Sequence, residues 1–175
     1  MPPLSDALGP WHDFYIMLGT ASATLIGLLF VAASVAPGVF SAERPHAMRV
    51  FLSPSVVHFT SILMVCLVVI APIRNHMPLV LLLGAEALFG LGYCVFVWRN
   101  MIRSGLSASL DLTDRTCYAA LPAVGYACIT AAAIMFESRA ETGCLLLPLG
   151  TCSLLLVGIR NAWDITSWTV MRRGG

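Results

Sequence analysis

The sequence predicts an all-α membrane protein in which residues 1–175 form a single bundle of five transmembrane helices. Hydrophobic residues make up 58% of the chain and charged residues only 11%, whereas about 25% of the residues in a soluble domain are charged. Five apolar segments occur, each of about 20 residues, which is the length that crosses a hydrocarbon core of about 30 Å. These segments occupy most of the chain, so we expect one domain with short loops.

Each segment is bounded by residues that end helices or form turns. Pro37 and Gly38 follow the first segment, residues 75–78 make a tight turn between the second and third, and the polar stretch 137–141 joins the fourth and fifth. The predicted spans are 14–36, 51–73, 78–98, 117–136 and 142–160, and the last helix extends to about residue 171.

The fourth span is the least apolar, and the arginines decide whether it crosses the membrane. The ten cationic residues are all arginines. With five spans and an external N-terminus, eight of them lie on the face that holds the C-terminus, and only Arg74 and Arg139 lie on the other. Without the fourth span the division is six to four. Because basic residues gather in cytoplasmic loops, the sequence predicts five spans, an external N-terminus and a cytoplasmic C-terminus.

One acidic residue, Glu86, lies near the middle of the third predicted span. A charge is costly at this depth, so the carboxyl group needs a partner, a proton or a function. Thr20 and Thr24 of the first span lie at a similar depth, judged by helical rise. Two interpretations stay open. Glu86 binds ions or relays protons, or it is a protonated acid that stabilises the bundle by bonding a threonine hydroxyl or a backbone carbonyl.

The first span contains small residues at every fourth position, namely Gly19, Ala23 and Gly27. Small residues at this spacing allow two helix backbones to approach closely, and close packing holds helices together in lipid. The spacing predicts a packing seam. The partner helix belongs either to the same chain or to a second subunit.

His58 lies inside the second predicted span, with Ser55 and Ser61 three residues away on either side. We expect a hydrogen-bonded structural histidine, because the chain offers no second axial ligand for a haem at matching depth. Ligation would need a partner subunit. No metal or other cofactor is predicted, since the acidic and histidine residues near the outer face come from separate segments that match no defined metal site.

The last helix carries the densest group of polar residues, formed by Arg160, Asn161, Asp164 and Ser167. Arg160 and Asp164 are four residues apart and can pair along the helix. This stripe contacts a lipid head group, an anionic ligand or a partner, or it is a neutral pair that fixes the helix at the inner surface.

Three stretches resemble a group of uncharacterised small integral membrane proteins of bacteria. They are residues 11–15 (WHDFY), 19–32 (GTASATLIGLLFVA) and 158–164 (GIRNAWD). The resemblance covers the first span and the last helix. It implies a multi-pass protein of the bacterial inner membrane and brings no known activity.

The sequence contains no Ser/His/Asp arrangement, phosphate-binding loop or H-E-x-x-H motif, so no catalytic residue and no enzymatic activity is predicted. No basic patch suggests nucleic acid as a partner. Two classes of function stay open. The first is a structural or regulatory membrane protein that assembles with itself or a membrane-protein partner through the small-residue seam. The second is a small proton or ion channel or transporter that uses Glu86.

Overall fold

The computed structural model describes residues 4–35, 45–73, 75–103 and 120–173, and it describes side chains between Asp6 and Asp164 except at residues 33, 35 and 45–53. All elements in these ranges are helical, as the composition predicts. In chain order they are α1 (Leu4–Leu8), η1 (Gly9–Trp11), α2 (His12–Val35), α3 (Pro45–Ile70), α4 (His76–Arg103), α6 (Leu121–Met135) and α7 (Ala140–Arg173).

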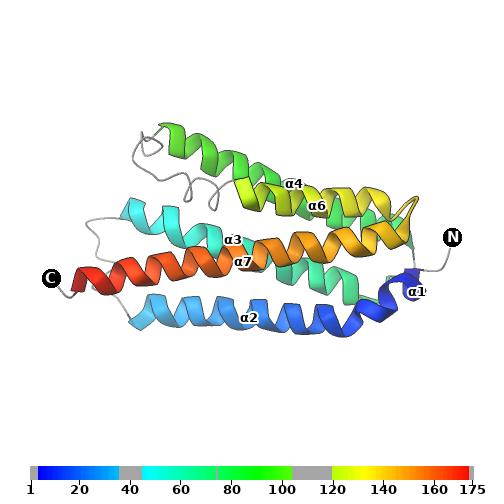
Figure 1. The fold of residues 1–175 in the computed structure, drawn as a ribbon, viewed down its shortest axis with the longest axis horizontal. Coiled ribbons are helices and arrows are strands. Elements are labelled where there is room, and N and C mark those ends of the chain that lie inside the picture. Colours follow the sequence, from blue (N-terminus) through cyan, green and yellow to red (C-terminus); the bar gives the residue numbers. More distant parts are fainter. Residues whose placement is uncertain (1–3, 36–44, 74, 104–119, 174–175) are drawn as a thin grey trace.

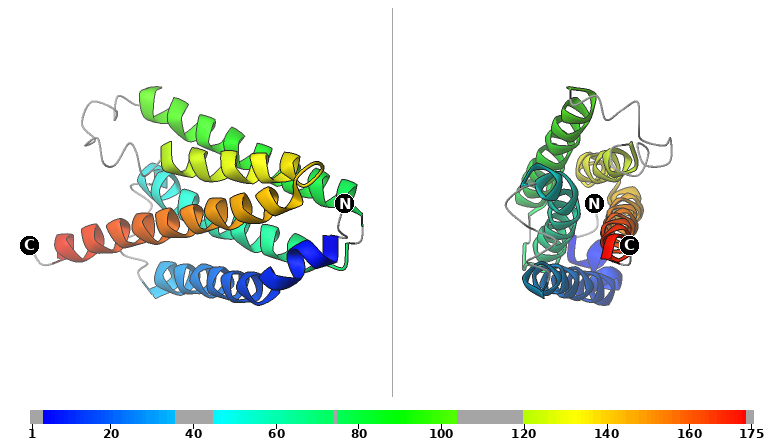
Figure 2. Two further views of the ribbon diagram at one scale, coloured as in Figure 1. Left: turned by 45° about the vertical axis from the view of Figure 1, so that its right-hand side comes forward. Right: turned by 90° about the vertical axis from the view of Figure 1, so that its left-hand side faces the viewer.

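The five long helices run alternately in opposite directions along one axis, and the two chain termini lie at opposite ends (Figure 1). We call the end that holds α1 the N-terminal end of the bundle, and the end where α7 finishes the C-terminal end. Helix α7 packs against α3 and α6, α3 also packs against α2 and α4, and α6 packs against α4. Seen along the axis, α2 and α4 lie on opposite sides of the bundle (Figure 2).

Each predicted span falls on one of these helices. In the described part of the chain, three helical stretches are long and apolar enough to cross a membrane, namely Asp6–Ala32, His76–Arg103 and Ala140–Asp164. Two further apolar helices among the described residues are shorter, Pro54–Ile70 and Leu121–Met135. Large apolar side chains also cover the outside of the bundle, and Phe30, Phe89 and Leu156 are each about two-thirds exposed. Extended apolar surface of this kind suits contact with lipid.

Glycines bring α6 and α7 into backbone contact. A Cβ on Gly150 would lie 2.7 Å from the carbonyl oxygen of Gly125, and a Cβ on Gly143 would lie 3.1 Å from that of Ala132. Any larger residue at Gly150 would push the two helices apart. This backbone contact is therefore built on residues of the fourth and fifth predicted spans.

Only part of the packing seam predicted on α2 contacts another helix of the same chain. A Cβ on Gly19 would lie 3.1 Å from the Cβ of Cys66 on α3, so Gly19 is at a close contact. Ala23 and Gly27 are exposed, and nothing lies within 4 Å of a Cβ on Gly27. A step of four residues turns about 40° further than a full helical turn. Residues at this spacing therefore drift from the α3 contact onto the outer surface.

Candidate functional site: a buried polar cluster

A hydrogen-bonded cluster lies inside the bundle, between α3 and α6. The Nδ1 atom of His58 is 3.0 Å from the phenol oxygen of Tyr126, and the Tyr126 hydroxyl donates to the Oγ of Ser61 at 3.0 Å. All three residues are at most 2% exposed. Polar groups in lipid are stable only when they are paired within the protein. The cluster therefore joins α3 and α6 at one register.

A glycine on α4 makes room for the Tyr126 ring. A Cβ at Gly90 would overlap the ring atoms of Tyr126, so only glycine lets the phenol lie against α4. Tyr93, one turn further along α4, meets the His58 ring edge to face with a centroid distance of 6.3 Å. Helices α3, α4 and α6 thus each place an aromatic or imidazole ring in the cluster.

The direction of the hydrogen bonds is linked to the tautomer of His58. When Tyr126 donates its only proton to Ser61, its oxygen accepts the proton of His58 Nδ1. In the neutral imidazole, Nε2 is then an acceptor. That atom is buried and has no hydrogen-bond partner among the described residues. An unpaired buried acceptor carries a desolvation cost of about 1–3 kcal/mol, so it requires an explanation.

Helix α7 adds a second unpaired polar side chain. Ser55 donates to the carbonyl oxygen of Gly158 at 3.3 Å, and a Cβ on Gly158 would lie 2.5 Å from the Phe59 ring, so glycine at this position makes room for a ring of α3 against α7. Asn161 follows one turn later. It is fully buried, and neither its Oδ1 nor its Nδ2 has a partner among the residues described.

Glu86 lies on α4 one turn from Gly90, on the side of the helix that carries Tyr93. Its side chain is half-buried, and its carboxyl group lies in the neighbourhood of the Tyr126 phenol. In the described part of the chain, no hydrogen bond or ion pair joins its carboxyl group to another residue. Glu86 is therefore a neighbour of the cluster without being fixed by it.

The structure places the two candidate threonine partners of Glu86 elsewhere. Thr20 and Thr24 are exposed on α2, on the opposite side of the bundle from α4 (Figure 2). Each hydroxyl donates to a carbonyl oxygen of its own helix at 2.8 Å, Thr20 to Ile16 and Thr24 to Thr20. Helical rise gives the depth of a residue but not the neighbours of its helix, and for this reason the sequence grouped them with Glu86.

The polar stripe of the last helix is divided between two faces. Arg160 and Asp164 form an ion pair of 3.5 Å on the surface, with side chains 39% and 37% exposed. A pair with this exposure contributes little to stability, typically below about 1 kcal/mol. Asn161 is turned about 100° around the helix from Arg160 and faces the interior. Ser167 lies in α7, and its side chain is outside the described residues.

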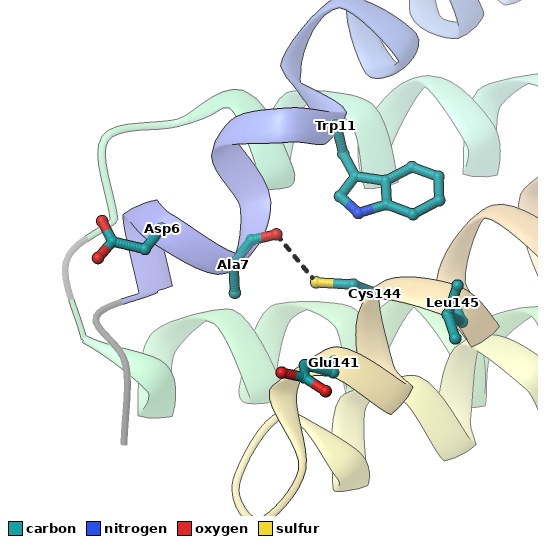
Figure 3. Close-up of a pocket in the computed structure, with 6 residues that line it drawn as sticks. All are labelled: Asp6, Ala7, Trp11, Glu141, Cys144 and Leu145. Carbon is teal, nitrogen blue, oxygen red and sulfur yellow. Dashed lines mark hydrogen bonds between the residues drawn. The ribbon is translucent and has the colours of Figure 1, made fainter.

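A pocket of about 370 Å³ lies at the N-terminal end, between α1, η1 and α7. In the wall of this pocket, the thiol of Cys144 on α7 donates a hydrogen bond to the carbonyl oxygen of Ala7 on α1 at 3.3 Å (Figure 3). The carboxylates of Asp6 and Glu141 also line it, but in Figure 3 they point in different directions and do not converge on one point. The described residues contain no group of three or more metal-ligating side chains.

Comparisons of the chain with models of protein families, with curated proteins and with solved structures find no match. The chemistry of the site must therefore be argued from its own residues.

Sequence reasoning singled out His58, with Ser55 and Ser61 on its face, but it missed Tyr126. One feature of the sequence could have indicated Tyr126. Tyrosines of membrane helices are enriched at the two interfaces, and Tyr126 lies near the middle of the predicted span 117–136. A phenol at that depth needs a hydrogen-bond partner inside the bundle.

The cluster predicts energetic coupling between Tyr126 and Ser61. Tyr126→Phe keeps the ring against Gly90 but removes the hydroxyl that bonds His58 and Ser61, and it leaves these two groups buried and unpaired. We therefore expect a loss of about 1–3 kcal/mol in unfolding free energy. With Ser61→Ala, a double-mutant cycle should give a coupling of about 0.6 kcal/mol or more. Unfolding in mixed detergent micelles measures both. Ser153→Ala, whose hydroxyl bonds only Leu149 of its own helix, is the control and should show no coupling.

Proposed function

We propose that the chain is a multi-pass protein of the bacterial inner membrane, with five spans, an external N-terminus and a cytoplasmic C-terminus. The alternating direction of the five long helices and the opposite positions of the two termini support an odd number of crossings (Figure 1). The arginines add an orientation, since all but two of the ten fall on the side of the C-terminus under this topology. The resemblance of residues 11–15, 19–32 and 158–164 to small bacterial membrane proteins supports the choice of membrane.

This topology predicts that the two ends of the protein lie in different compartments. A reporter that is active only in the periplasm should work when fused before Trp11 and fail when fused after Arg173. A reporter active only in the cytoplasm should give the reverse result. Finding both ends in one compartment would contradict the five-span arrangement.

We propose further that the protein takes up and releases protons at Glu86 as a small proton-conducting channel or transporter. The observation that carries this proposal is an unpaired carboxyl group beside a buried hydrogen-bonded cluster. An acid that served only to hold helices together would be expected to have a partner for its proton or its charge. Glu86 has neither among the described residues, and both threonines that were candidates bond their own helix.

The side chains near Glu86 favour a proton over a metal cation. Cations such as Ca²⁺ take six to eight oxygen ligands, several of them carboxylates or carbonyls. The described surroundings of Glu86 hold its own carboxyl group and the phenol of Tyr126, which is hydrogen-bonded in turn to the imidazole of His58. These groups donate and accept protons, and they do not form an oxygen cage.

Proton flux into liposomes tests the proposal. With an internal pH-sensitive dye and a potassium diffusion potential, vesicles that hold the wild-type protein should acidify faster than empty vesicles. Glu86→Gln should return the rate to that of empty vesicles, because an amide does not titrate. Glu137→Gln removes an exposed carboxylate at the N-terminal end and should leave the rate unchanged. Equal rates for wild-type and empty vesicles at both polarities would overturn the proposal.

A second candidate function is assembly through the outer face of α2, and one observation favours it. The lipid-facing surface of this helix holds small residues, Ala23 and Gly27, and two threonines whose hydroxyls are already bonded to their own helix. Between Thr20 and Gly27 the described side chains of this face are small, and the two hydroxyls among them are paired within the helix, so the backbone of another helix can approach closely here. The occupant that we propose is α2 of a second copy of the chain.

Assembly predicts a different sensitivity to substitution at two exposed glycines. Gly27→Leu should lower the fraction of dimer measured by mass in nanodiscs or mild detergent, because the added side chain separates the two helices. Gly92→Leu is the matched control, since Gly92 is exposed on α4 and nothing lies within 4 Å of its Cβ position. A dimer fraction that is the same in both variants, or a monomeric wild-type protein, would count against assembly.

A further inference from the structure

The pocket at the N-terminal end of the bundle is lined by groups that attract a cation. Its volume of about 370 Å³ is of the size that holds small ligands and lipid head groups. Asp6 and Glu141 line it together with the indole ring of Trp11, and none of the described residues that line it is basic (Figure 3). A cleft with charges of one sign concentrates ions of the other sign, and the face of an indole ring also attracts cations.

The arrangement of the carboxyl groups favours an ammonium group over a metal ion. Asp6 belongs to α1 and Glu141 to α7, and their side chains point in different directions (Figure 3). A metal ion needs several ligands that converge on one point, whereas an ammonium group has N–H donors that point in different directions. Within the described ranges, no ion pair joins Glu141 to a basic residue. Its carboxylate is therefore available to an ammonium group from outside the chain.

The pocket continues into an apolar stripe on the outside of α7. Glu141 and Leu145 both line the pocket and are exposed, so the pocket opens on the outer surface of this helix. Leu145, Leu149 and Leu156 share one helix face by their spacing, and they are 59%, 61% and 67% exposed. By helical rise, the stripe is about 16 Å long. This length matches the hydrocarbon of one leaflet, about 15 Å, so the stripe fits an acyl chain.

Charges of both signs lie next to the opening of the pocket. Arg139 is exposed two residues before Glu141, and no ion pair between the two occurs among the residues that the structure describes. The planar guanidinium group of arginine binds phosphate. An occupant that carries an ammonium group and a phosphate group therefore matches the charges here better than a simple amine does.

A buried hydroxyl near the pocket lacks a hydrogen-bond acceptor. The phenol of Tyr15 lies in the neighbourhood of the Cys144 thiol, which lines the pocket. Tyr15 is fully buried, and its oxygen has no hydrogen-bond partner among the described side chains and backbone groups. The thiol itself donates to Ala7. The phosphate and ester oxygens of a phospholipid are acceptors, and a lipid in the pocket would bring near Tyr15 the kind of group that its hydroxyl lacks.

We propose that this pocket binds a phospholipid with a primary ammonium head group, whose ammonium lies against Glu141 and Trp11 and whose acyl chain follows Leu145, Leu149 and Leu156. The inference rests on the proposed membrane location and on neither the proton function of Glu86 nor the orientation of the chain. It assigns a specific lipid to the leaflet at the N-terminal end of the bundle.

Competition between lipids tests the head group. Nanodiscs are prepared with equal amounts of phosphatidylethanolamine, phosphatidylcholine and phosphatidylglycerol, and native mass spectrometry counts the lipids that stay on the released protein. One phosphatidylethanolamine should be retained in preference to the other two. Glu141→Gln should lower its retention by about two- to fivefold, the range expected for an exposed ion pair. Glu137→Gln is the matched control, because Glu137 is an exposed acid at the same end that does not line the pocket.

A phosphatidylethanolamine with a photoreactive group in its acyl chain tests the position of the chain. Its crosslinks should fall on α7 between Leu145 and Leu156, and Glu141→Gln should reduce them. Equal retention of the three lipids, preference for phosphatidylglycerol or phosphatidylcholine, equal effects of the two substitutions, displacement by soluble phosphoethanolamine or crosslinks confined to other helices would each overturn the proposal. Selective retention without proton flux would support the lipid site and reject conduction through Glu86, and flux without selective retention would do the reverse.

Discussion

Each polar group inside this bundle must find its hydrogen-bond partner within the protein, because lipid supplies none. Several polar groups of the described core meet this constraint through backbone carbonyls. Thr151 donates to carbonyl groups of its own helix, and Ser55 reaches a carbonyl of the next one. The cluster of His58, Tyr126 and Ser61 satisfies the same constraint between two helices. Among the described residues, the buried polar atoms without a partner belong to Tyr15, Ser22, His58, His76 and Asn161, and of these residues His58 is the one that belongs to the cluster beside Glu86.

Close helix contacts and buried polar groups depend on each other in this fold. Glycine at 90 admits the ring of Tyr126, and glycine at 158 lets α7 approach so closely that its carbonyl oxygen meets the hydroxyl of Ser55. In both cases an alanine would force the helices to shift, and the hydrogen bond beside it would be lost as well. Association in lipid rests on this close packing, so the same residues set the packing and the chemistry of the interior.

The sequence predicted the helices well and the contacts between them poorly. Apolar length and the turns around Pro37, residues 75–78 and 137–141 were sufficient to place five helices, because bilayer thickness and backbone hydrogen bonding leave few alternatives. Depth along a helix was also accessible, and so Glu86 and His58 were recognised as unusual. The direction in which each residue points around its helix could not be predicted. Thr20 and Thr24 share the depth of Glu86 but lie on the other side of the bundle. Asn161 faces the interior, although Arg160 beside it in the same predicted stripe faces outward. Tyr126 was overlooked because its importance comes from a glycine on a different helix.

The fit of Tyr126 against Gly90 also restricts how α4 can slide. Residues one turn to either side of Gly90 on α4 are Glu86, Ala87, Tyr93 and Cys94, and each carries a side chain where glycine carries none. An axial displacement of α4 by one turn would therefore press a side chain onto the phenol ring and tilt its oxygen away from His58. Gly90 therefore limits axial sliding of α4, and any such sliding would be coupled to loss of the hydrogen bond between Tyr126 and His58.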